Sequence, residues 1–129
     1  MTVQLNHTIV YSHDKRNSAE FLSRILGLGT PETFGHFVTV EMANGVSLDF
    51  DDSDEIRTQH YAFLVDEADF DPIFERVKEQ GIEFYAYPGH ANPGEINTRR
   101  GGRGFYFDDP SGHHMEVLTP AALPVTTSA

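Results

Sequence analysis

The chain of 129 residues contains no cysteine. Disulfide bridges, thiolate zinc sites and a cysteine nucleophile are therefore excluded. The absence fits a reducing compartment, and we expect a cytoplasmic protein. No apolar run approaches the length that crosses a membrane, and the first residues lack the apolar core of a signal peptide. We therefore expect no membrane partner.

Basic residues are also scarce. Nine Lys and Arg stand against 20 Asp and Glu, which gives a formal net charge of -11 at pH 7. A surface this acidic repels phosphate backbones, so we expect no nucleic-acid partner. The apolar fraction of 39% is sufficient for a core, and the length fits one domain or two small modules that share a core.

One sequence pattern occurs twice. The segment Leu5–Val10 is echoed by Thr58–Phe63, and both segments alternate as strands do. The echo places His7 and His60 at the same position of their copies. Two histidines at equivalent places in a repeat suggest a shared centre.

The second echo adds two carboxylates. Asn44–Phe50 is matched by Ser111–Val117, which places Asp49 opposite Glu116. Both carboxylates lie between apolar residues of a predicted strand, so both face away from the side that packs on a helix. A carboxylate pointing into a cleft is costly unless it is paired or bound to a cation.

The repeats predict two modules with the order βαβββ. Residues 1–55 form the first and residues 56–119 the second, and 120–129 are expected to be a flexible tail. We therefore predict an α+β fold in which the two modules form a curled mixed sheet around a cleft. Neither module alone can cover its sheet, so the two are expected to pack together.

Helix boundaries are marked by capping residues. Asp14 is a predicted N-cap, and Gly27 and Gly29 are the predicted stop signals for the first helix. The second helix is predicted to start at Asp71-Pro72, where the missing N–H of proline is tolerated, and to close at Gly81.

Imidazole and carboxylate groups together are a ligand set for a divalent transition metal. The repeat therefore predicts a metal site formed by His7, His60 and Glu116. Asp49 is the fourth candidate ligand. It is one methylene shorter than glutamate and lies beside an acidic loop, so its participation stays open.

The same segments resemble a known superfamily. The openings Asn6–Val10 and Gln59–Phe63 and the close Gly104–Val117 are similar to the vicinal oxygen chelate superfamily, and the resemblance covers Val3–Thr119. This superfamily includes glyoxalase I, extradiol dioxygenases, fosfomycin-modifying transferases and bleomycin-resistance proteins. The closing segment is its most specific part.

The resemblance implies a function. His7, His60 and Glu116 match the family's metal ligands, and Asp49 falls where glyoxalase I has Glu. It implies a cofactor ion of Fe, Mn, Ni, Co or Zn that holds a small substrate through its oxygen atoms. Glu116 and Asp49 are then the candidate catalytic carboxylates, since a metal carboxylate in this class can act as a base.

Two classes of function follow. The first is a metal-dependent enzyme, either a glyoxalase-like lyase or isomerase or a dioxygenase. The second is an antibiotic-sequestering protein of the bleomycin-resistance type, which usually lacks the metal residues. A fosfomycin transferase is disfavoured because Ile9 stands where those enzymes carry Thr. The resemblance also implies a homodimer.

A loop at 88–103 is predicted to carry the substrate contacts. It is rich in glycine and basic on an acidic protein, so it is a candidate lid, although a solvated loop is an equal reading. His90 is a further candidate for the extra histidine that extradiol dioxygenases use. The candidate substrate-binding residues are Arg99, Arg100, Arg103, Tyr106, His114 and Phe37.

Overall fold

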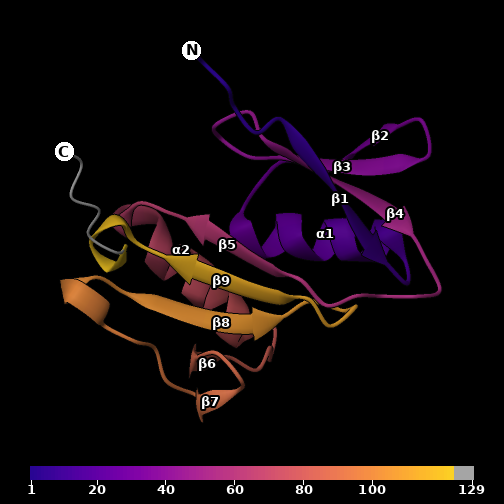
Figure 1. The fold of residues 1–129 in the computed structure, drawn as a ribbon. Coiled ribbons are helices and arrows are strands. Elements are labelled where there is room, and N and C mark those ends of the chain that lie inside the picture. The colour runs from indigo at the N-terminus through magenta and orange to yellow at the C-terminus, as the bar shows by residue number, and fades with distance from the viewer. Residues whose placement is uncertain (124–129) are drawn as a thin grey trace. The chain divides into compact units, whose positions relative to one another are not determined.

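The computed structural model describes residues 1–123, which divide into two compact units (Figure 1). Met1–Thr58 and the turn Asp109–Gly112 form the first unit. Gln59–Asp108 and residues 113–123 form the described part of the second. Among residues 1–123, no helix is both long and apolar enough to span a membrane.

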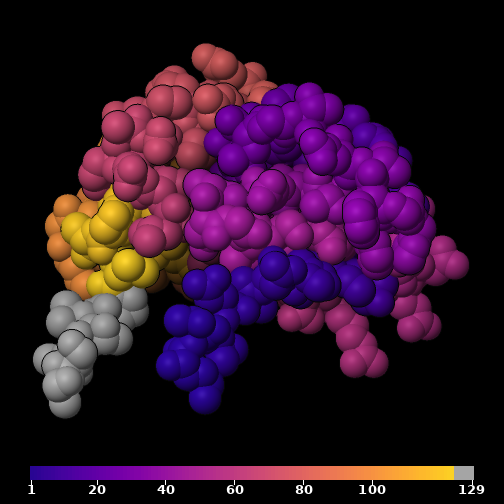
Figure 2. All heavy atoms as spheres, turned by 90° about the horizontal axis from the view of Figure 1, so that it is seen from above, coloured from indigo at the N-terminus to yellow at the C-terminus, as the bar shows by residue number. Residues whose placement is uncertain are grey.

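The first unit is a four-stranded mixed sheet with one helix. The sheet order is β1-β4-β3-β2, in which β1 and β4 are parallel and the other pairs are antiparallel. Residues 1–6 are exposed, and the earliest of them project from this unit in the darkest indigo (Figure 2). The elements are β1 His7–Ser12, α1 Lys15–Leu26, β2 Glu32–Phe34, β3 Phe37–Glu41 and β4 Ser47–Asp52.

Helix α1 has the predicted ends. The Asp14 carboxylate accepts a hydrogen bond of 3.1 Å from the backbone N–H of Asn17, which satisfies one of the unpaired donors of the first turn. Gly27 ends the helix in the left-handed conformation, with φ of 71°, where glycine has no steric penalty. The buried apolar residues that α1 contributes to the core are Ala19, Leu22 and Ile25.

The second unit repeats this arrangement with one more strand. Its sheet order is β5-β9-β8-β6-β7, and β5 and β9 are parallel, as β1 and β4 are. The two mixed sheets confirm the predicted α+β fold. The elements are β5 His60–Leu64, α2 Glu67–Glu79, β6 Tyr85–Tyr87, β7 Ala91–Pro93, η1 Arg99–Gly101, β8 Gly104–Asp108, β9 His114–Leu118 and η2 Pro120–Ala122.

Helix α2 begins earlier than predicted. Its first residue is Glu67, so Pro72 lies inside the helix and not at its start. The backbone N–H of Phe70 donates to the carbonyl of Asp66, which forms the first turn, and the Phe70 side chain is fully buried. Pro72 removes one intrahelical hydrogen bond, and the burial of Phe70 offsets this loss.

The predicted loop at 88–103 contains regular structure. Strand β7 pairs with β6 through Tyr85 with Pro93 and Tyr87 with Ala91. Pro93 is accommodated because β7 is the edge strand of its sheet. On the outer side of an edge strand there is no further strand that would need the N–H that proline lacks. The short helix η1 then follows.

The predicted tail is also partly ordered. Residues Pro120–Ala122 form η2, and Ala122 is buried. The backbone N–H of Arg103 donates to Thr119 Oγ1 at 2.9 Å, which holds the chain just before η2. The rest of the predicted tail, 124–129, lies outside the described residues.

Candidate active site

His60 and Glu116 meet on one face of the sheet in the second unit. His60 opens β5 and is paired in register with His114, while Glu116 on β9 is paired with Ala62. The two side chains therefore reach across diagonally, and His60 Nε2 lies 2.9 Å from Glu116 Oε1. Only 8% of Glu116 is exposed, so its carboxylate needs a compensating partner.

This pair fits a divalent metal ion. Metal bonds to imidazole nitrogen and carboxylate oxygen are about 2.0–2.2 Å long, so two ligand atoms on one ion lie roughly 3.0–3.4 Å apart. The observed separation of 2.9 Å needs only a small side-chain adjustment to reach that range. His60 and Glu116 can therefore provide one nitrogen and one oxygen ligand from neighbouring strands.

The equivalent residues of the first unit make different contacts. His7 opens β1, and its Nδ1 lies 2.7 Å from Asn6 Oδ1. Asp49 lies on the adjacent strand β4, where its Oδ1 accepts hydrogen bonds from Ser47 Oγ at 3.0 Å and Thr39 Oγ1 at 3.2 Å. The shorter carboxylate is thus engaged by hydroxyl groups of its own sheet. Two of the four predicted ligands lie in each unit.

A small cavity adjoins His60 in the second unit. Its volume is about 70 Å³, and three tyrosines and three histidines contribute to its wall. Two predicted substrate-binding residues, Tyr106 and His114, are among them. The lining residues are His60, Tyr85, Tyr87, Pro88, Gly89, His90, Tyr106, Asp108 and His114.

Arg99 does not line the cavity itself, but it contacts two of the tyrosines that do. Its Nη1 donates to the Tyr106 hydroxyl at 3.4 Å, and its guanidinium carbon lies 5.1 Å from the ring centre of Tyr87. Burial raises the pKa of the Tyr106 hydroxyl, the hydrogen bond from Arg99 opposes the rise, and the negative charge of Glu116 adds to it. The hydroxyl is therefore protonated at neutral pH, and a cation stands beside it.

The other two predicted arginines have partners elsewhere in the second unit. Arg100 Nη1 donates to the carbonyl of Ala122 at 3.1 Å. Arg103 forms ion pairs with Glu67 at 2.9 Å and with Asp71 at 2.6 Å, both on α2. The hydrogen bond to Asp71 is the main reason that the pKa of Arg103 is raised. These contacts join the 99–103 segment to η2 and α2, and neither arginine lines the cavity.

Phe37 belongs to the first unit. It opens β3, is half-buried, and its ring centre lies 4.0 Å from that of His36. The structure thus places Phe37 in a different unit from the cavity.

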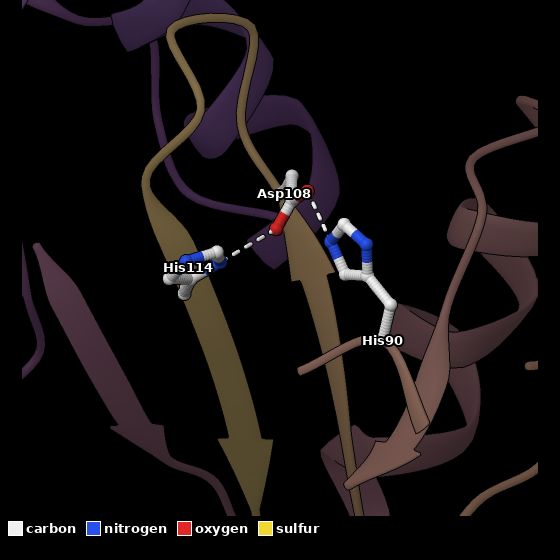
Figure 3. A group of neighbouring side chains, drawn as sticks. All are labelled: His90, Asp108 and His114. Carbon is white, nitrogen blue, oxygen red and sulfur yellow. Dashed lines mark hydrogen bonds and ion pairs between the residues drawn. The ribbon is translucent and has the colours of Figure 1, made fainter. Parts of the chain in front are cut away.

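Asp108 lies at this site, although it was not among the candidate residues predicted from the sequence. His90 Nε2 lies 2.7 Å from its Oδ2, and His114 Nδ1 lies 2.8 Å from its Oδ1, so the carboxylate bridges two imidazoles (Figure 3). A usable signal existed in the hairpin of β8 and β9. Antiparallel pairing around its turn places Asp108 directly opposite His114.

The fold agrees with the comparisons with known proteins. Residues 4–117 match the Glyoxalase/Bleomycin resistance protein/Dioxygenase superfamily. The chain therefore belongs to this family, which is the vicinal oxygen chelate superfamily.

Several relatives carry an assigned activity. The chain is 29% identical over 125 residues to a glutathione transferase FosA from Serratia marcescens, and the match covers 91% of this chain and 81% of that protein. Two solved structures are more similar. Oxidase ChaP-H1 has 54% identity and a TM-score of 0.89, with 92% of this chain and 96% of that one covered. Oxidase ChaP-H2 has 55% identity and a TM-score of 0.91, with both chains fully covered.

Proposed function

We propose that this protein is a metal-dependent oxidase that acts on a small substrate with neighbouring oxygen atoms. His60 and Glu116 are the proposed ligands of the second unit. His7 is the third ligand predicted from the repeated sequence, and Asp49 stays the fourth candidate. The contact of 2.9 Å between His60 and Glu116, next to a cavity, is the observation that carries the proposal.

The residues of this site fit the chemistry of such an ion. When bound, a divalent transition metal supplies Lewis acidity and holds the oxygen atoms of a substrate. An imidazole and a mostly buried carboxylate on adjacent strands are pre-positioned ligands, because the sheet fixes both backbones. No rearrangement of the backbone is needed to bring the two together.

The cavity wall supports an aromatic, hydroxylated substrate. Tyr85, Tyr87 and Tyr106 provide ring surfaces for stacking, and Pro88 adds apolar area that excludes water. Arg99 lies against two of these rings and favours a substrate that carries negative charge, such as a phenolate. The cavity of about 70 Å³ accommodates one part of such a molecule, with the remainder outside it.

The relatives favour oxidation over the other reactions of the superfamily. Two structures named as oxidases share 54% and 55% identity with this chain over at least 92% of its length. The relative named as a glutathione transferase shares 29%. Oxidation therefore takes precedence over thiol transfer and over the lyase or isomerase chemistry of glyoxalases.

The first experiment measures metal content and oxygen consumption together. Untagged protein, purified without chelators, is analysed for Fe, Mn, Co, Ni and Zn, reconstituted with each ion, and supplied with a panel of catechols and related hydroxylated aromatics. We expect at least one tightly held ion per chain that requires Glu116, and oxygen uptake that depends on both ion and substrate. Glu116→Gln should lose this ion and the oxygen uptake. Glu95→Gln, which removes an exposed carboxylate of the same unit, should keep them.

Other outcomes identify other functions. A Glu116→Gln variant that keeps its metal and its activity would show that the ligand assignment is wrong. Bound metal with isomerisation of a hemithioacetal, and no oxygen uptake, would indicate a glyoxalase-type enzyme. Tight binding of an aromatic antibiotic without metal and without turnover would indicate the sequestering protein.

A further inference from the structure

We propose that His90, Asp108 and His114 form a second divalent-metal site in the second unit. This site is distinct from the His60–Glu116 pair. It does not depend on the oxidase proposal, because metal binding can be measured without any substrate.

The three side chains converge on one small volume. His90 Nε2 lies 2.7 Å from Asp108 Oδ2, and His114 Nδ1 lies 2.8 Å from Asp108 Oδ1. One ligand atom from each residue lies within 4.8 Å of the other two. Figure 3 shows Asp108 between the two rings, with one carboxylate oxygen directed to each. Small rotations of the side chains bring these separations to the roughly 3.0–3.4 Å of ligands that share an ion.

The residue types select a class of ion. Two imidazole nitrogens and one carboxylate oxygen suit Zn, Co, Ni, Cu or Fe(II) better than Mg or Ca, which prefer oxygen alone. With neutral imidazoles the three groups carry one negative charge, on a chain of net charge -11. Both charges attract a divalent cation.

The backbone holds two of the three ligands rigidly. Asp108 ends β8 and His114 begins β9, and the two are direct partners in the antiparallel register. The β8–β9 hairpin therefore keeps their side chains on the same face of the sheet. Ligands on adjacent strands give a more constant geometry than ligands on loops.

His90 is held toward the same point by its turn. It adopts a left-handed conformation with φ of 58°, directly after Gly89 with φ of 75°. A residue other than glycine occupies this region only when its surroundings enforce it. The His90 ring stacks on Tyr85 with ring centres 4.4 Å apart and an angle of 17° between the planes. This stacking fixes the plane of the imidazole while its Nε2 faces Asp108.

The cluster is accessible to an ion from solvent. The side chains of His90 and His114 are 52% and 49% exposed, and that of Asp108 is 35% exposed. Water or a substrate atom can therefore complete the coordination. All three residues also line the cavity that His60 lines, so an ion held here would face a molecule bound in that cavity.

The test is a metal titration of the full chain. Metal-free protein is titrated with Co(II) by calorimetry, while the visible absorbance reports the coordination of the ion. We expect two ions per chain in the unaltered protein and one in the double variant His60→Ala/Glu116→Gln. In both backgrounds His90→Asn should remove one ion or weaken its binding at least about tenfold. Asparagine is the chosen replacement because it tolerates the left-handed conformation.

Two further variants make the result specific. Asp108→Asn, which keeps the shape of the side chain, should weaken the binding of the same ion. His36→Asn is the matched control, since His36 lies 3.5 Å from the single carboxylate of Asp51 and should not affect Co(II) binding. Circular dichroism and melting curves verify that each variant is folded.

The outcomes separate this site from the oxidase centre. If His90→Asn and Asp108→Asn leave Co(II) stoichiometry and affinity unchanged, the second site does not exist and the cluster is only hydrogen-bonded. If these two variants abolish all Co(II) binding, and His60→Ala/Glu116→Gln leaves Co(II) binding unchanged, the site at His90, Asp108 and His114 is confirmed. The ligand assignment in the proposed oxidase centre then fails.

Discussion

His60 Nε2 lies 2.9 Å from Glu116 Oε1, although the two residues are not partners in the register of β5 and β9. The contact depends on the length of the glutamate side chain, which reaches diagonally across the parallel pair. In the first unit, His7 and Asp49 hold the equivalent places on β1 and β4. The aspartate is one methylene shorter, and Ser47 and Thr39 donate to it.

This difference predicts unequal effects of two carboxylate substitutions. Glu116→Gln should lower metal affinity at least about tenfold, because it removes the charge of a mostly buried carboxylate that is a proposed ligand. Asp49→Asn should have a smaller effect, since its Oδ1 still accepts from the two hydroxyl groups. Competition with a coloured chelator measures both affinities. An equal loss in Asp49→Asn would make Asp49 a full fourth ligand.

The repeat carried much of what could be predicted from the sequence. Alternation predicted that Asp49 faces away from the core, and its neighbours Leu48 and Phe50 are buried as expected. The predicted Asp14 cap and Gly27 stop of α1 were also confirmed, because such short-range signals depend only on nearby backbone groups.

Features that depend on tertiary contacts were harder to predict. Proline preference placed the start of α2 too late, because the burial of Phe70 outweighs one missing hydrogen bond. The sequence of the basic loop did not indicate which arginine has which partner. Arg103 pairs with α2, whereas Arg99 reaches the tyrosines of the cavity. Charge alone does not distinguish a substrate contact from an internal ion pair.

Arg103 should contribute to stability and not to substrate binding. Its Nε and Nη2 both donate to Glu67, its Nη1 donates to Asp71, and its guanidinium lies 4.2 Å from the ring centre of Phe70. Arg103→Met should cost about 1 kcal/mol of unfolding free energy, because the carboxylates are exposed and regain water. Arg103→Lys should recover part of this loss. Urea unfolding provides the measurement.

Arg99 provides the comparison for this variant. Arg99→Ala should raise KM for an anionic substrate while the urea midpoint changes little. A rise in KM for Arg103→Met, with unchanged stability, would return Arg103 to the substrate-binding residues.

Gly102 should tolerate no side chain. A Cβ at this position would overlap the backbone nitrogen of Ala122 and lie 2.9 Å from both Ala121 C and Ala122 Cα. These are backbone atoms, so Gly102→Ala must displace η2. The substitution should lower the free energy of unfolding by about 1–3 kcal/mol. Gly29→Ala is the matched control, since nothing lies within 4 Å of its Cβ. Gly29→Ala should leave the free energy of unfolding unchanged or raise it by up to about 1 kcal/mol. Equal melting temperatures for the two variants would contradict this packing.

Tyr85 should make the protein sensitive to alkaline pH. Its hydroxyl donates to Glu83 Oε2 at 2.9 Å, and this hydrogen bond is the main reason that the pKa of Tyr85 is raised above 10.0. A raised pKa in the folded state contributes stability that is fully present below pH 10.0. The contribution is lost as the pH rises through the folded value. Tyr85→Phe should therefore lose less stability than the unaltered protein above pH 10.0.

The absorbance of tyrosinate tests the cause of this shift. Glu83→Gln should move one late-titrating tyrosine to lower pH, because the carboxylate that opposes ionisation is gone. Tyr85→Phe should remove the same transition from the titration curve, and Tyr87→Phe serves as the control for the loss of any one tyrosine. If Glu83→Gln leaves the titration unchanged, the hydrogen bond to Glu83 does not govern the ionisation of Tyr85. The alkaline loss of stability must then arise from another group.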